Sequence, residues 1–307
     1  MEIITRTSTR QLLEVCSRMY SMGLEPKFYD IKIKVYHANT ETIIYASKAN
    51  LIALNVISAE ADPREFFIIN GTHPSVVELL LKYCYTGVIN ELDSGLLIAT
   101  IIYSKTINFS GFSFLLEEHL RKVILATLLT NTPAYNFKVW VTMKSYQLDP
   151  QNITVLIFDQ IQKQNPTEIF NGIFYHQPRD IVVEIIKQDY LRLSEIYIFQ
   201  RIFEWSWVQL SGNLTPKFKP NFLKIISGNA ILVPKVCAKL REIFEPLFEY
   251  LRFENISMEE VIQVLEPAKI FSKDELWHII KSGNNNKNSQ PFLLFGKHFT
   301  SGRKKRE

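Results

Sequence analysis

The sequence predicts an α+β domain, in which helices wrap a small sheet, followed by an all-helical domain. Three observations support this fold class. The length of 307 residues fits about two domains at roughly 150 residues each. Strand and helix patterns are mixed before about residue 130, whereas only helix patterns follow residue 132. Apolar residues make up 47% of the chain against 21% for charged residues, so both parts can bury a core.

The N-terminal domain is predicted to begin with an amphipathic helix over residues 9–22. Apolar residues recur at helical spacing at Leu12, Val15, Cys16, Met19 and Tyr20. Ile31, Ile33 and Val35 then alternate with lysines, which predicts a strand with one buried face. The predicted elements that follow are a strand at residues 42–45, a helix at 49–57 and a strand at 66–69.

The next helix is predicted to begin at Pro74, because proline suits a first helical turn, where its missing N–H would have no helical partner. Gly87 is placed to end this helix in a left-handed cap. The predicted buried face consists of Val76, Val77, Leu80, Leu81 and Cys84. Two more helices, near residues 94–106 and 112–129, complete the N-terminal domain, which we place at residues 9–130.

Cap signals define the second domain, which we place at residues 132–281. A cap residue followed by a first-turn proline occurs at Asp149-Pro150, Asn165-Pro166 and Gln177-Pro178. The spacing of a capping box occurs at Ser257 with Glu260 and at Ser272 with Glu275. The polar stretch between Leu210 and Pro234 is predicted to be a loop or an insertion. Residues 282–307 are predicted to be a linker and a disordered basic tail.

The net charge of +4 does not indicate a nucleic-acid partner. Residues 303–307 contribute +3 of it, and a nucleic-acid binder needs basic residues clustered on one face. The tail is interpreted either as a solvated terminus or as a nuclear localisation signal. Cys16, Cys84 and Cys237 lie far apart in apolar contexts, which indicates reduced thiols in a cytoplasmic or nuclear protein. No stretch approaches the roughly 20 apolar residues of a membrane span, so no membrane partner is expected.

The sequence predicts no catalytic, cofactor-binding or metal site, and hence no enzyme. It contains no nucleophile elbow, phosphate-binding loop, dinucleotide fingerprint or His-Glu-x-x-His motif. The histidines lie outside ligand spacing and are interpreted as surface or cap residues: His37, His73, His119, His176, His278 and His298. The tryptophans lie in apolar helices without interleaved Arg or Lys and are interpreted as core residues: Trp140, Trp205, Trp207 and Trp277.

Four segments of the N-terminal domain resemble a BTB (POZ) domain. Residues 28–36 resemble the first strand of that domain, with Asp30 at its usual acidic position. Residues 44–55 resemble its second strand and the helix that follows. Residues 79–87, which end in Tyr-Thr-Gly, resemble its most specific signature, and residues 96–99 fit the next helix.

The second domain resembles a BACK domain. The clearest segment is residues 189–195, followed by Ile198-Phe199 and then Trp205. Residues 251–280 resemble the final helices of that domain. With the N-terminal segments, the resemblance covers roughly residues 9–281. The chain contains no Gly-Gly doublet, so the Kelch propeller that follows many such pairs is not expected.

The resemblance implies a protein-interaction adaptor that forms a homodimer through the 9–22 helix. The implied interface residues are Leu12, Leu13, Cys16, Met19 and Tyr20. The alternative is that this apolar face packs on its own domain. The resemblance also implies binding to a cullin scaffold and work as a substrate adaptor of a ubiquitin ligase. The residues implied to face the cullin are Leu54, Val56, Ile57, Tyr103 and Ser104.

The sequence departs from the BTB pattern at positions linked to partner binding. Ser47 and Asn55 stand where the family usually has His and Ser. Residues 57–62 lack the hydrophobic-x-Glu pattern linked to cullin binding. The alternative function is therefore a cullin-independent structural or regulatory scaffold that homodimerises or pairs with other BTB proteins. A third interpretation is a nuclear regulator that depends on the basic tail.

Overall fold

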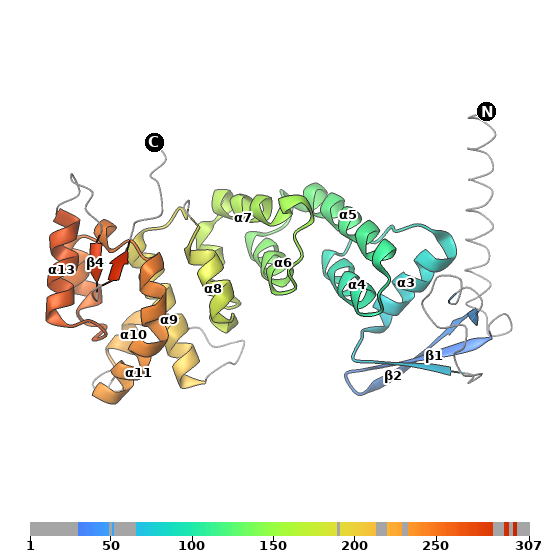
Figure 1. Cartoon of the computed structure of the whole chain (residues 1–307), viewed down its shortest axis with the longest axis horizontal. Coiled ribbons are helices and arrows are strands. Elements are labelled where there is room, and N and C mark those ends of the chain that lie inside the picture. Colours follow the sequence, from blue (N-terminus) through green and yellow to red (C-terminus); the bar gives the residue numbers. More distant parts are fainter. Residues whose placement is uncertain are drawn as a thin grey trace, which may run out of the picture. The chain divides into compact units, whose positions relative to one another are not determined.

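The computed structural model describes residues 30–48, 51, 66–188, 191–212, 220–228, 233–284, 292–294 and 297–299 (Figure 1). The chain divides into two compact units. The first unit comprises Met1–Asn131 and Thr142–Thr154, and the second comprises Thr132–Val141 and Val155–Glu307. The helix that crosses residue 141 therefore belongs partly to each unit.

The first unit contains the predicted small sheet. Its strands are β1 (Ile31–His37), β2 (Thr40–Ala46) and β3 (Phe66–Asn70). The strand order is β2-β1-β3, with β2 antiparallel and β3 parallel to the central β1. Ile31, Ile33 and Val35 are buried, which confirms the predicted alternation. Ala38 and Asn39 both have positive φ, as a two-residue hairpin between twisted strands requires.

The helices of the first unit begin and end at local signals. They are α3 (Pro74–Thr86), α4 (Ser94–Thr106) and α5 (Ser110–Thr127). The ring Nδ1 of His73 accepts from the N–H of Ser75, and the Asp93 carboxylate accepts from the N–H of Leu96. Gly87 has φ 66° and donates its N–H to the carbonyl of Tyr83, which confirms the predicted left-handed cap.

The core of the first unit lies between the sheet and α3. Ile33 and Val35 of β1 pack with Leu81 and Tyr85 of α3 in one buried cluster. The buried face of α3 includes the predicted valines and leucines, and Cys84 is partly buried at its edge. Tyr85, one turn after Leu81, fills the core at this level of the helix.

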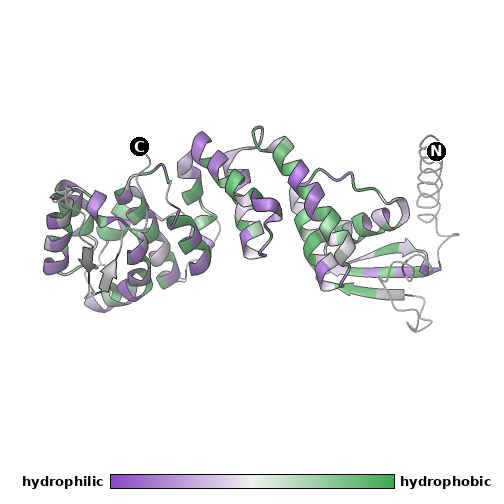
Figure 2. Ribbon diagram, turned by 45° about the horizontal axis from the view of Figure 1, so that its top comes forward, coloured by the Kyte–Doolittle hydropathy of each residue, from purple (hydrophilic) through white to green (hydrophobic). Residues whose placement is uncertain are grey.

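The second unit is built from helices alone over its described residues between 155 and 284. The helices that follow α5 are α6 (Pro133–Ser145), η2 (Pro150–Asn152), α7 (Ile153–Gln164), η3 (Pro166–Phe170), η4 (Phe174–His176), α8 (Arg179–Ile186), α9 (Glu195–Ser211), α10 (Phe222–Ile226), α11 (Pro234–Phe244), η6 (Glu245–Tyr250), η7 (Phe253–Asn255), α12 (Met258–Glu260), η8 (Val261–Leu265) and α13 (Lys273–Asn284). Apolar and polar residues alternate around these helices, as amphipathic packing requires (Figure 2).

The predicted caps of the second unit have mixed outcomes. Asn165 accepts from the N–H of Thr167, as predicted, and Ser257 forms the predicted capping box with Glu260. The prediction for Gln177 is wrong, because Pro178 itself occupies the cap position of α8. A proline can stand there because the cap residue has extended rather than helical backbone angles.

Two segments that were predicted to lack regular secondary structure contain helical turns or strands. The stretch between Leu210 and Pro234 includes α10, whose Phe222 is buried in the aromatic core. Residues 292–299 contain two strands, β4 (Phe292–Leu294) and β5 (Lys297–Phe299), which pair antiparallel. The expectation of a wholly disordered tail is therefore wrong for these residues.

Aromatic side chains form the core of the second unit. Phe199 and Phe203 lie one turn apart on α9, with their ring centroids 5.2 Å from Phe244 and 5.2 Å from Phe222, respectively. Trp140 and Trp205 are buried, as predicted. The prediction for Trp277 is wrong, because this side chain is 63% exposed on α13. Of the four residues one turn away on α13, three are charged (Lys273, Asp274 and Lys281), so its own helix provides little apolar cover.

Replacing Gly87 by alanine should lower the free energy of unfolding by about 1 kcal/mol, because a Cβ is strained at a φ of 66°. Gly111→Ala is the matched control, since Gly111 lies inside α5 with open space around its Cα. That change should raise stability by about 0.5–1 kcal/mol. Urea unfolding followed by circular dichroism measures both, and effects of the same sign would contradict the cap assignment.

Candidate protein-interaction surfaces

Asp30 and Tyr85 fix the chain where it leaves the sheet. Asp30 precedes β1, and its Oδ1 accepts from the N–H of Lys48 at 2.5 Å. The hydroxyl of Tyr85 accepts from the N–H of Ser47 at 2.6 Å. Leu51 donates its N–H to the carbonyl of Ser47, which is a helical hydrogen bond. Two side chains from distant segments therefore hold the start of one helical turn.

The described part of the chain contains two of the residues implied in partner binding. The others lie outside the described residues: Leu12, Leu13, Cys16, Met19, Tyr20, Leu54, Val56 and Ile57. Tyr103 is half-buried and packs against the core beneath the sheet. Ser104 is fully buried, and its hydroxyl donates to the carbonyl of Ile101 at 2.8 Å. The expectation that Ser104 faces a partner is therefore wrong.

The outer face of the sheet exposes apolar side chains around a lysine. Lys34 lies between Ile43 on β2 and Ile68 on β3 in the strand register, and both isoleucines are exposed. The Lys34 ammonium is 3.6 Å from the Glu41 carboxylate, which also accepts from the Tyr36 hydroxyl. An exposed ion pair of this kind contributes little to stability, so breaking it costs little. A partner could therefore bind this face of the sheet.

A second exposed surface runs along α5. The inward face of this helix buries Phe112, Leu116, Leu120, Val123 and Ile124. The opposite face, together with the turn after the helix, exposes Gly111, Leu115, Glu118, Lys122, Leu125 and Leu129, which we call the α5 outer stripe. Phe114 lies beside the stripe and is 62% exposed. Large exposed apolar residues grouped on one face are typical of an interaction site.

Glu204 lies at the centre of a buried polar cluster in the second unit. Its carboxylate accepts from the Tyr175 hydroxyl at 2.6 Å and from the N–H of Phe222 at 2.7 Å, and it pairs with Arg201 at 2.7 Å. Burial raises the pKa of Glu204, although the hydrogen bond from Tyr175 and the charge of Arg201 oppose this shift. The guanidinium of Arg201 lies 5.0 Å from the ring centre of Tyr197.

The Glu204 cluster acts as a structural tie. With 0% of its side chain exposed, the carboxylate is closed to ligands from solution. Its partners belong to η4, α9 and α10, so it joins three helices. The only local signal for this site is the i,i+3 spacing of Arg201 and Glu204, since Tyr175 and Phe222 come from distant segments.

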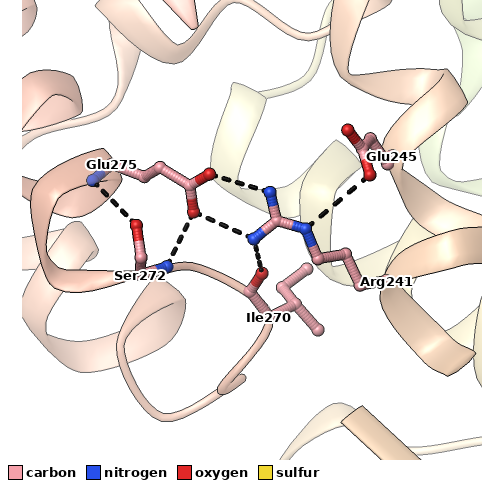
Figure 3. Close-up of polar contacts among 5 residues, drawn as sticks. All are labelled: Arg241, Glu245, Ile270, Ser272 and Glu275. Atoms are coloured by element: carbon pink, nitrogen blue, oxygen red, sulfur yellow. Dashed lines mark hydrogen bonds and ion pairs between the residues drawn. The ribbon is translucent and has the colours of Figure 1, made fainter. Parts of the chain in front are cut away.

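Arg241 clamps α11 to the start of α13 (Figure 3). Its guanidinium donates two hydrogen bonds to the Glu275 carboxylate, at 2.8 and 3.0 Å, and a third to the Ile270 carbonyl at 3.0 Å. The same carboxylate accepts from the N–H of Ser272 at 2.7 Å, and the N–H of Glu275 donates to the Ser272 hydroxyl. The predicted capping box is confirmed, and it also positions the carboxylate for Arg241.

Other groups that could support chemistry are few in the described part of the chain. It holds no cluster of three or more His, Cys, Asp and Glu side chains able to bind a metal. His37 and His73 approach each other with ring centroids 5.1 Å apart. Burial raises the pKa of the Cys84 thiol to about 12, so it is protonated at neutral pH and is a poor nucleophile.

No protein-family model matches the sequence, and no curated protein matches it. Among the helices that the structure describes, none combines the length and the apolar character needed to cross a membrane.

Replacing Glu275 by glutamine should lower the free energy of unfolding at pH 7 by about 2 kcal/mol, because a neutral amide replaces an acceptor that binds a guanidinium. Glu245→Gln is the matched control. Its carboxylate lies 3.7 Å from the Nε of Arg241 and is half-exposed, so its loss should cost less than about 0.5 kcal/mol. Urea unfolding measures both variants, and equal losses would contradict the assignment of the clamp to Glu275.

The effect of Glu275 should also depend on pH. Burial alone raises the pKa of its carboxyl, but the hydrogen bonds from Arg241 and Ser272 outweigh burial, and the net pKa is lowered. A lowered folded pKa stabilises the fold above the ordinary value of about 4.3, and this contribution is lost as the pH falls through the folded value. The stability gap between the wild type and Glu275→Gln should therefore shrink between pH 7 and pH 3.

Proposed function

We propose that this chain is a non-enzymatic protein-interaction adaptor that dimerises through the helix predicted at residues 9–22. The proposal rests on hydrogen bonds between three BTB-like segments of the first unit. Asp30 from the first segment and Tyr85 from the third both accept hydrogen bonds from the second, at Lys48 and Ser47. The antiparallel pairing of β1 with β2 and the packing of Tyr85 on the sheet bring these residues together, an arrangement compatible with the sheet and helices of a BTB domain.

The second unit supports a BACK-like role in the same manner. Ser194 caps α9, and the carboxylate of the next residue, Glu195, accepts from the N–H of Arg252. These residues belong to the two segments that resemble a BACK domain, at residues 189–195 and 251–280. We propose that this unit is a helical spacer whose buried carboxylates join helices, as Glu204 does, rather than bind substrates.

The role in a ubiquitin ligase is the more specific part of the proposal. We propose Leu54, Val56, Ile57 and the exposed part of Tyr103 as the surface for a cullin scaffold. The burial of Ser104 removes one member of that surface. The alternative, a cullin-independent scaffold that pairs with itself or with other BTB proteins, is favoured by this loss. A cytoplasmic location, with a nuclear one as the alternative, fits either role.

Replacing both Leu13 and Met19 by aspartate should convert the dimer to a monomer or to an aggregate, because charges would enter the apolar contact. Multi-angle light scattering measures the mass at low micromolar concentration. Ile262→Asp is the matched control, since it puts the same charge on an exposed apolar position of the second unit. An unchanged dimer mass in the Leu13/Met19 variant would exclude this interface.

Binding to the purified N-terminal region of a cullin should separate the two proposed roles. The ligase role requires a measurable Kd, which Ile57→Asp should raise at least about tenfold if the charge must be buried in the complex. The control is Ile262→Asp in the second unit, which should leave the Kd unchanged. Absence of binding at tens of micromolar would remove the ligase role and leave the scaffold.

A further inference from the structure

The α5 outer stripe has the spacing of a coiled-coil seam. Successive members are separated by four, three, four, three and four residues, which is the heptad interval of helices that pack along their length. The stripe lies opposite the face that packs on α4, so it is not used by the core of the first unit. Its ends are apolar, at Leu115, Leu125 and Leu129, and its centre is charged.

The stripe is complementary to itself when a second copy runs in the opposite direction. In an antiparallel pair centred on Leu120, residues equally distant from the centre lie opposite each other. Leu115 then faces Leu125 of the second copy, and Glu118 faces Lys122. We propose that two copies of this chain associate through an antiparallel contact between their α5 outer stripes.

The charges select this direction. A two-fold axis repeats the Glu118–Lys122 contact, so the antiparallel pair contains it twice. A parallel pair in register would instead place glutamate against glutamate and lysine against lysine, which is repulsive. The stripe therefore specifies one arrangement and disfavours the other.

The flanking residues fit the same register. Gly111 lies opposite Leu129 of the second copy, and the missing side chain leaves room for the leucine. Phe114, beside the stripe, lies opposite the small and exposed Ala126. Alternation of large and small residues across a contact is how helices interdigitate. Four independent pairs thus agree on one centre.

The contact is small, because α5 has only 18 residues. Interfaces that are stable on their own bury at least about 1,000 Å², so this association should be weak and should grow with concentration. It does not depend on the proposed dimer at residues 9–22. Where both two-fold contacts form, they link dimers into tetramers or longer chains.

Charge exchange on the full-length protein tests the proposal. Sedimentation velocity over a range of concentrations should show reversible association of the wild type. Glu118→Lys alone places lysine opposite lysine, and Lys122→Glu alone places glutamate opposite glutamate, so each should weaken association at least about tenfold. An equimolar mixture of the two variants should restore it, because every pair between unlike copies is then attractive.

The double variant Glu118→Lys/Lys122→Glu should also associate like the wild type. All these side chains are exposed, so circular dichroism should show an intact fold. Repeating the series in the Leu13→Asp/Met19→Asp background isolates the α5 contact from the proposed N-terminal dimer. A wild-type mass that does not change with concentration, or a mixture that fails to restore association, would overturn the proposal.

Discussion

The packing of the inner face of β1 against α3 is the contact on which the first unit depends. Three short strands have no second layer of their own, and a sheet must bury one face to be stable. Ile33 and Val35 provide that face, and Leu81 with Tyr85 covers it. The Tyr85 hydroxyl extends the same contact to Ser47, so the turn after β2 is positioned by the core helix. The same packing leaves the other face of the sheet open to solvent at Ile43 and Ile68.

Local signals predicted most of the fold, because backbone groups at element ends are satisfied by neighbours in sequence. Gly87, Ser257 and Ser272 lie where their caps were predicted, and the alternation of β1 defined its buried face. The failures concern burial that is decided by distant segments. Ile279 of α13 is fully buried, whereas Trp277, two residues earlier, is left exposed. Ser104 has the polarity of a surface residue, but its hydroxyl bonds to the preceding helical turn, as serine can do inside a helix.

The two polar clusters of the second unit differ in how far sequence could have revealed them. In the Arg241 clamp, Ser272 and Glu275 form a capping box whose spacing can be recognised in the sequence. Only Arg241 belongs to another helix. In the Glu204 cluster, Tyr175 lies well before Glu204 in the sequence and Phe222 lies well after it, so no local spacing links the three residues. A buried charge with several donors contributes less to net stability than its contacts suggest, because desolvation offsets them. Its effect is to favour one arrangement of η4, α9 and α10, since any other would leave the carboxylate without partners.

The two faces of α5 illustrate how one helix can serve both a core and a contact between molecules. The inward face is apolar apart from Ser113 and carries no charge, so it packs on α4 without specifying orientation by charge. The outer stripe interrupts its leucines with Glu118 and Lys122, which lowers its attraction for unrelated apolar surfaces. A fully apolar stripe would bind any similar face in either direction, whereas charges at the centre make the contact depend on register. Weak association with a defined direction would suit the proposed adaptor, because it lets assembly respond to the local concentration of the protein.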